Sequence, residues 1–119
     1  LSDLAAAASR NGTAVTVDVD PAVDLDADGT AVVYRVAREA LQNVTKHAGA
    51  EQVTVTLAPD DAATVLTVRD DGAGFDPATV PEGHVGLRLL RDLAAESGAD
   101  LVIDSVPGEG STVRLAVPT

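Results

Sequence analysis

Four polar side chains recur at helical spacing within one segment, and their types suit the binding of a metal ion and phosphate. Glu39, Asn43, Lys46 and His47 stand at positions i, i+4, i+7 and i+8, so a helix places them on one face. A carboxylate and an amide one turn apart can present two oxygens to a hydrated divalent cation, and an ammonium one turn further can reach phosphate oxygens. The alternative is an ordinary amphipathic helix in which Glu39 pairs loosely with Asn43.

A second group opens a loop after a predicted strand, with the sequence Asp70-Asp71-Gly72-Ala73-Gly74. A carboxylate at a strand end only accepts hydrogen bonds, which suits an exocyclic amine such as that of adenine. Gly72 and Gly74 let the backbone approach a flat ring where a Cβ would obstruct it. A plain Asp-Gly turn is the alternative. The chain contains neither G-K-[ST] nor G-x-G-x-x-G, which excludes phosphate loops of the Walker and Rossmann types.

Two further glycine-rich segments stand beside predicted elements. Residues 83–87 (Gly-His-Val-Gly-Leu) immediately precede a second amphipathic helix, where free backbone N–H groups and the helix dipole favour an anion. A simple glycine hinge is the alternative reading. Residues 108–112 (Gly-Glu-Gly-Ser-Thr) lie between the last two predicted strands and by themselves indicate only a hairpin.

An acidic run before the long helix matches a calcium-binding EF-hand loop only in part. Asp24, Asp26, Asp28 and Gly29 fit its first positions, but Arg35 occupies the twelfth, where the bidentate glutamate belongs. We therefore expect no calcium site there, and we expect Asp26 or Asp28 to cap the helix that follows.

Composition limits the classes of function. The 119 residues suffice for one domain, and an apolar content of 45% excludes a disordered chain. A net charge of −11 argues against a nucleic-acid partner and requires any nucleotide site to use a metal and arranged donors. The absence of cysteine excludes disulfides and thiolate chemistry. No membrane span or leader peptide is visible, so we expect a cytoplasmic domain without direct membrane contact.

The elements that position these groups follow from the periodicity of the apolar residues. Helices are predicted over 1–10, 28–47 and 85–97, and alternating strands over 13–19, 52–58, 63–69, 99–105 and 111–117. The second and third strands form one antiparallel hairpin, and the fourth and fifth form another. This order predicts an α+β fold in which helices cover one face of a sheet.

The four motifs, in this order along the chain, resemble the ATP-binding catalytic domain of sensor histidine kinases. That domain belongs to the superfamily of gyrase, Hsp90, histidine kinase and MutL. Its Bergerat fold is a two-layer α/β sandwich: a mixed, mostly antiparallel five-stranded sheet covered on one face by about three helices. The resemblance extends from about Val15 to Pro118, and residues 34–48 are similar to the subfamily whose partners are NarL-type response regulators.

The resemblance implies ATP and Mg²⁺ as ligands, phosphoryl transfer as the reaction, and a role for each matching residue. Glu39 would be the catalytic residue that orients or deprotonates the attacking group, and Asn43 would hold the Mg²⁺ that bridges the phosphates. Asp70 would receive the adenine amine. The other implied ATP-binding residues are Lys46 and His47 on the helix, Gly72 and Gly74 beside the ring, Gly83, Gly86 and Leu87 at the end of the ATP lid, and Thr112, whose hydroxyl helps fix adenine.

The resemblance also implies a domain organisation. Residues 1–12 would end a linker helix from a preceding dimerisation and phosphoacceptor domain, and residues 13–119 would form the catalytic domain with a short lid at about 74–86. No phosphoacceptor motif is present, so we expect this fragment to bind ATP with little or no turnover. The partners would be the dimerisation domain of the same homodimeric kinase and a NarL-type regulator; anchoring of the full-length protein in the membrane stays open. An anti-sigma-factor serine kinase and a non-catalytic interaction module are the alternatives.

Overall fold

The computed structural model describes Ala6 and residues 14–43, 52–72, 85–105 and 110–118; for Asn43 and residues 85–89 it describes the backbone alone. The elements are β1 (Ala14–Val19), α2 (Ala27–Asn43), β2 (Gln52–Asp60), β3 (Ala63–Asp70), α3 (Val85–Glu96), β4 (Asp100–Ser105) and β5 (Ser111–Pro118). Every strand predicted from the alternation of apolar residues is present, with bounds that differ by one or two residues.

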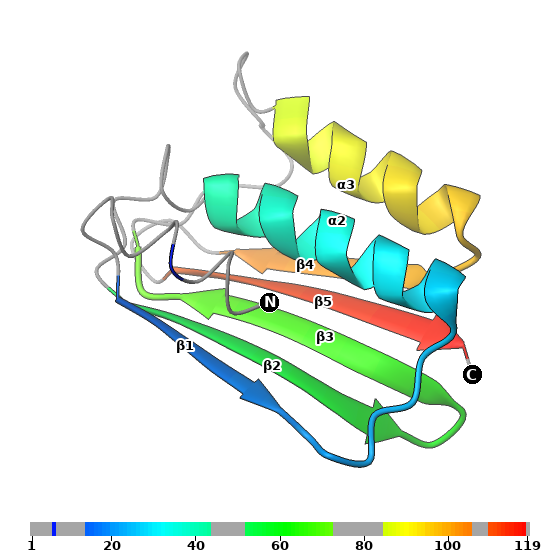
Figure 1. Cartoon of the computed structure of the whole chain (residues 1–119). Coiled ribbons are helices and arrows are strands. Elements are labelled where there is room, and N and C mark those ends of the chain that lie inside the picture. Colours follow the sequence, from blue (N-terminus) through cyan, green and yellow to red (C-terminus); the bar gives the residue numbers. More distant parts are fainter. Residues whose placement is uncertain (1–5, 7–13, 44–51, 73–84, 106–109, 119) are drawn as a thin grey trace.

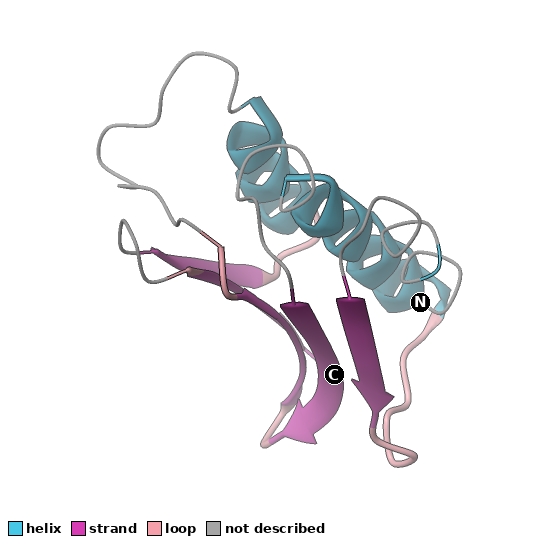
Figure 2. Cartoon of the chain, turned by 90° about the vertical axis from the view of Figure 1, so that its left-hand side faces the viewer, coloured by secondary structure: helices cyan, strands magenta, loops and turns pink. Residues whose placement is uncertain are grey.

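The strands form one mixed sheet in the order β1-β2-β3-β5-β4. β1 and β2 run parallel, because α2 carries the chain back along the sheet between them, and the other three neighbouring pairs are antiparallel. Both predicted hairpins, β2–β3 and β4–β5, are therefore confirmed. Helices α2 and α3 lie antiparallel to each other on the same face of the sheet (Figure 1), and the view turned by 90° shows the two layers (Figure 2).

The two-layer α+β sandwich is thus confirmed, and two of the expected helices are described at length. Of the helix expected over 1–10, Ala6 alone lies among the described residues, and it is helical. Helix α2 is described as far as Asn43, so the predicted continuation to His47 lies outside the described residues. Neither long helix of the described part of the chain has the length and apolar character needed to cross a membrane.

The core lies between the sheet and the two helices. Val36 of α2, Leu90 of α3, Leu66 of β3 and Leu115 of β5 are fully buried there. Burial alternates along the strands, so one face of each strand packs on the helices (the helix face of the sheet) and the other face points away from them. This alternation decides which polar side chains can reach a site between the layers.

Local signals fix the beginning of α2 and the end of α3. The carboxylate of Asp26 accepts a hydrogen bond from the Gly29 N–H at 2.7 Å, and the Asp26 carbonyl accepts one from the Thr30 hydroxyl at 2.8 Å. Asp26 is therefore the helix cap, as one of the two predicted candidates. Helix α3 ends at Glu96, and Gly98 terminates it with a φ of +67° that suits glycine, while the Ala99 N–H donates to the Ala94 carbonyl at 3.0 Å.

Candidate functional site

The ends of several elements meet at one end of the sheet, which we call the Asp70 end. Asp70 at the end of β3 pairs with Ser111 at the start of β5, and Ser111 also pairs with Ser105 at the end of β4. The last turn of α2 and the first turn of α3 lie over the same end (Figure 1). The fold therefore brings together segments that are up to 70 residues apart in the sequence, since Asn43 and Val113 both lie near this end.

Asp70 is the only charged side chain among the buried residues of the described part of the chain, and it is 6% exposed. Its Oδ1 accepts a hydrogen bond from the Gly72 N–H at 2.9 Å, and its Oδ2 accepts one from the Ser111 hydroxyl. A buried carboxylate is tolerated only when such donors compensate the lost water. Each oxygen of a carboxylate can accept two hydrogen bonds, so Asp70 keeps the capacity to receive an amine as well.

The neighbouring carboxylate has a different role. Asp71 is exposed, and its Oδ1 accepts a hydrogen bond from the Gln52 N–H at 3.0 Å, while its own N–H donates to the Gln52 carbonyl at 3.3 Å. Asp71 therefore ties the segment after β3 to the start of β2. Of the two adjacent acids, Asp70 alone faces the interior.

The structure places Ser111, and not Thr112, beside Asp70. Ser111 shares the helix face of β5 with the buried Val113 and Leu115, whereas Thr112 alternates to the opposite face, where it pairs with Arg69. The hydroxyl bonded to Asp70 is thus that of Ser111, while the role expected of Thr112 near adenine stays a prediction. The alternation of apolar residues in β5 could have identified Ser111 from the sequence. Ser111 stands two positions before Val113, and residues two apart in a strand share one face of the sheet.

Gly110 permits the close approach of β5 to Asp70. A Cβ on Gly110 would lie 2.3 Å from the carbonyl oxygen of Asp70, and the φ of Gly110 is +82°. Both the space and the backbone angle therefore require glycine at this position.

Two of the residues predicted for the site, Glu39 and Asn43, lie in the part of α2 nearest the Asp70 end. Glu39 is half-buried and stands one helical turn, about 6 Å, before Asn43, the last residue of α2. Gly86 and Leu87 belong to the first turn of α3, which begins at Val85 and so overlaps the last two residues of the expected lid. The predicted residues Lys46, His47, Gly74 and Gly83, with lid residues 74–84, lie outside the described residues.

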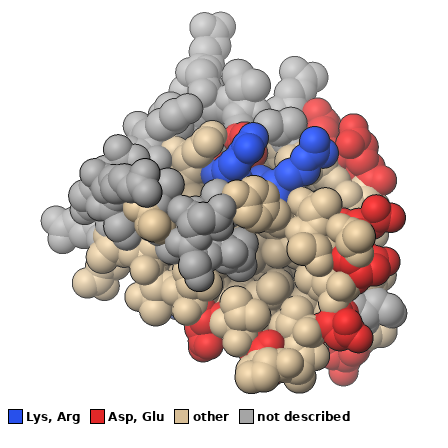
Figure 3. Space-filling view, viewed as in Figure 1, with Lys and Arg blue, Asp and Glu red and all other residues tan. Residues whose placement is uncertain are grey.

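Charge is unevenly distributed over the surface. Figure 3 shows acidic side chains gathered along one edge of the molecule, while the basic side chains in that view lie close together over the helices. With 19 acidic residues against 8 basic ones, the domain as a whole opposes the approach of an anion. A polyanionic ligand therefore needs a counter-charge supplied at its own site.

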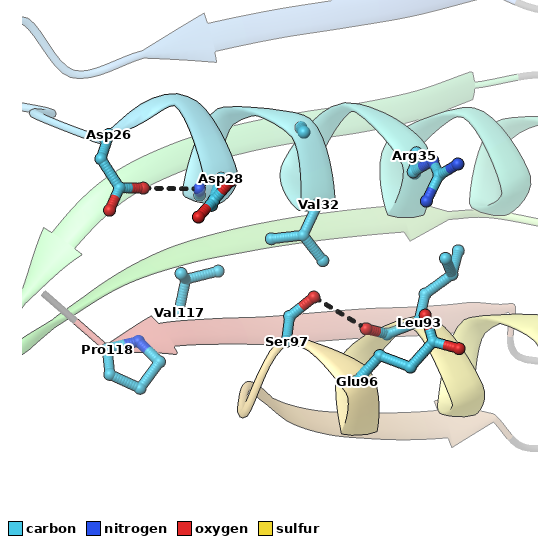
Figure 4. Close-up of a pocket in the computed structure, with 11 residues that line it drawn as sticks. Asp26, Asp28, Val32, Arg35, Leu93, Glu96, Ser97, Val117 and Pro118 are labelled. Carbon is cyan, nitrogen blue, oxygen red and sulfur yellow. Dashed lines mark hydrogen bonds between the residues drawn. The ribbon is translucent and has the colours of Figure 1, made fainter.

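A pocket of about 530 Å³ lies at the other end of the sheet, lined by the start of α2, the end of α3 and the end of β5 (Figure 4). Its walls include Asp28, Glu96 and Pro118, and none of the predicted site residues. Pro118 pairs with Ala63, seven residues and about 23 Å along β3 from Asp70. This pocket is therefore separate from the candidate site.

Comparison with known proteins decides the family. The model of the family described as "Histidine kinase-, DNA gyrase B-, and HSP90-like ATPase" matches residues 27–119. The chain belongs to this ATPase family. The matched range includes α2, Asp70 and Ser111, so it covers the described elements that build the candidate site.

Relatives of this ATPase-family chain include a sensor protein and a sensor histidine kinase. It is 34% identical over 112 residues to the nitrate/nitrite sensor protein NarQ of Escherichia coli, covering 90% of this chain and 20% of NarQ. It is 35% identical over 118 residues to the sensor histidine kinase NarS of Mycobacterium tuberculosis, covering 96% of this chain and 27% of NarS. The chain thus spans about a fifth to a quarter of the length of these relatives.

A solved structure shows the same fold. The blue-light activated histidine kinase of Erythrobacter litoralis EL346 superposes with a TM-score of 0.82 at 25% identity, covering 98% of this chain and 40% of that one. The resemblance to sensor histidine kinases noted in the sequence is confirmed by these relatives, as is the mixed sheet with helices on one face.

Proposed function

We propose that this chain is the Mg-ATP-binding catalytic domain of a sensor histidine kinase. It would donate the γ-phosphate of ATP to a histidine on a separate dimerisation domain, for relay to a NarL-type response regulator. The observation that carries the proposal is the buried carboxylate of Asp70, held by the Gly72 N–H and the Ser111 hydroxyl where α2 and α3 meet the sheet. Relatives whose names are those of sensor histidine kinases, NarS among them, favour a histidine over a serine as acceptor.

Adenine recognition would depend on the orientation of Asp70. Ser111 and the Gly72 N–H each occupy one acceptor site of a different carboxylate oxygen, which fixes the plane of the group. The remaining acceptor sites would receive the exocyclic amine of adenine. A guanine would present a carbonyl oxygen to the same carboxylate, so the site would select against it.

Phosphoryl transfer would depend on the end of α2. Bound ATP supplies the phosphoryl group and bound Mg²⁺ offsets the charge of the triphosphate. Asn43 would hold the metal, with Lys46 and His47 beyond it near the phosphates. Glu39, half-buried one turn earlier, would orient or deprotonate the imidazole of the acceptor histidine. Because that histidine would lie on another domain, we expect the chain alone to bind ATP with little or no turnover.

The wider organisation is part of the proposal. Residues 1–12 would end a linker helix from the dimerisation domain, and the short lid would lie between Gly74 and the start of α3 at Val85. The domain would work in the cytoplasm, where ATP is available.

Calorimetric titration with Mg-ATP tests the proposal. Asp70→Ala should weaken ATP binding by about 1–3 kcal/mol, because the amine loses a charged hydrogen-bond acceptor. Asp71→Ala is the matched control, since it removes the adjacent carboxylate, which bonds to the backbone of Gln52. It should leave the ATP affinity within about twofold of the unmodified chain. Equal affinities of the two variants would refute the role of Asp70.

A further inference from the structure

A buried hydroxyl, outside the motifs that identified the Asp70 site, lies next to that site. Ser105, the last residue of β4, is 7% exposed, and its Oγ donates a hydrogen bond to the carbonyl of Gly110 at 3.2 Å. Ser105 pairs across the sheet with Ser111, and Ser111 pairs with Asp70. Three polar side chains therefore form one row across β4, β5 and β3 on the helix face of the sheet.

The peptide between Gly110 and Ser111 is constrained on two sides by this row. Its carbonyl oxygen accepts the hydrogen bond from Ser105, while the Cα of Gly110 lies so close to Asp70 that a Cβ would stand 2.3 Å from the Asp70 carbonyl oxygen. The residue that follows, Ser111, donates to the carboxylate of Asp70. A displacement of this peptide would move the Ser111 hydroxyl relative to Asp70.

We propose that Ser105 is a positioning residue for nucleotide recognition. Its hydroxyl holds the Gly110–Ser111 peptide in place, so that Ser111 keeps the Asp70 carboxylate in the plane that receives the adenine amine. Ser105 acts through this peptide and has no contact with the nucleotide itself. The inference rests on the proposed function, because it assigns Ser105 a part in the same adenine site.

A purely structural serine would make a different prediction. Loss of a buried hydroxyl leaves the Gly110 carbonyl without that donor and lowers the stability of the fold in either case. If Ser105 acted on the fold alone, its removal would leave the preference for one base over another unchanged. If it acts through Asp70, its removal reduces specifically the part of the affinity that comes from the amine.

The experiment compares Mg-ATP with the triphosphate of purine riboside, which lacks the 6-amine, by calorimetric titration of the whole chain. The unmodified chain should bind ATP more tightly than this analogue. Ser105→Ala should weaken ATP roughly 2- to 10-fold and leave the analogue within about twofold, so that the ratio of the two affinities falls. In an Asp70→Ala background, Ser105→Ala should have no further effect on that ratio, because two residues that act through one contact are not additive.

Ser97→Ala is the matched control. The Ser97 hydroxyl also donates to a backbone carbonyl, that of Leu93 at 3.0 Å, but at the other end of the molecule (Figure 4). This variant loses the same kind of bond and should keep the ratio of the unmodified chain. If thermal unfolding shows that Ser105→Ala does not fold, Ser105→Cys, which keeps a side chain of similar shape with a weaker donor, takes its place and should lower the ratio.

The outcomes separate the two proposals. If the unmodified chain binds ATP and the analogue equally, the adenine site itself is wrong and the proposed function loses its main support. If the unmodified chain prefers ATP but the serine variant keeps that preference, or weakens both ligands equally, the role of Ser105 is refuted while the proposed function stands.

Discussion

At the scale of single residues, the candidate site depends on which face of a strand each side chain occupies. The motif Asp70-Asp71-Gly72 was visible in the sequence, and the burial of Asp70 agrees with its selection as the acceptor. The hydroxyl that bonds to Asp70 belongs to Ser111, and the role expected of Thr112 in fixing adenine stays a prediction. Ser111 and Thr112 are both hydroxyl residues, and only the register with β3 distinguishes them.

Gly110 gives a prediction at this scale. Gly110→Ala should lower the free energy of unfolding by at least about 2 kcal/mol, because the methyl group adds a backbone clash to the strain of a positive φ. The measurement is urea unfolding. Gly98→Ala is the control: Gly98 has a φ of +67° but nothing within 4 Å of its Cβ position, so only the strain of about 1 kcal/mol applies. Equal losses in the two variants would show that the contact with Asp70 is not tight.

At the scale of the elements, the periodicity of the apolar residues located the five strands and the two long helices that the structure describes. Alternating apolar residues predicted β1, β2 and β3, and the buried face of α2 shows the helical spacing of Val33, Val36, Ala37 and Ala40. The order of the strands was not predictable in the same way. β5 lies between β3 and β4 in the sheet. This order depends on how α3 packs across the sheet, and no local sequence pattern specifies that packing.

The cap of α2 gives a prediction for this element. Asp26→Ala should destabilise the fold by about 1 kcal/mol, since the Gly29 N–H loses its acceptor at the first turn. Thermal unfolding measures the loss, and ATP titration should show an unchanged affinity, because the cap lies at the end of α2 away from Asn43. Asp24→Ala, an exposed acid before the cap, is the control with little effect. A loss of ATP affinity in Asp26→Ala alone would contradict the separation of the two ends.

At the scale of the whole molecule, the net charge of −11 opposes the binding of an anionic nucleotide at the candidate site. The acidic edge seen in Figure 3 repels a triphosphate, so affinity has to come from donors and a cation gathered at one end. The sequence could predict this requirement from composition alone. The spacing of Glu39 and Asn43 also predicted a place for the cation at the end of α2, and that placement stays a prediction.

The net negative charge of the domain leads to a prediction about the metal ion. Removal of Mg²⁺ by a chelator should weaken ATP binding much more in the unmodified chain than in Asn43→Ala, because that variant has already lost the proposed metal ligand. Gln42→Ala is the control, since it removes a neighbouring exposed amide of α2 and should keep the full dependence on Mg²⁺. Equal dependence on Mg²⁺ in the unmodified chain and Asn43→Ala would argue against Asn43 as the ligand.

A crystal structure of the chain with Mg²⁺ and a non-hydrolysable ATP analogue tests the central claim most directly. The account predicts the 6-amine within about 3 Å of the Asp70 carboxylate, with the Ser111 hydroxyl still bonded to it. The base bound elsewhere, for example in the pocket between Glu96 and Pro118 at the far end of the sheet, would contradict it.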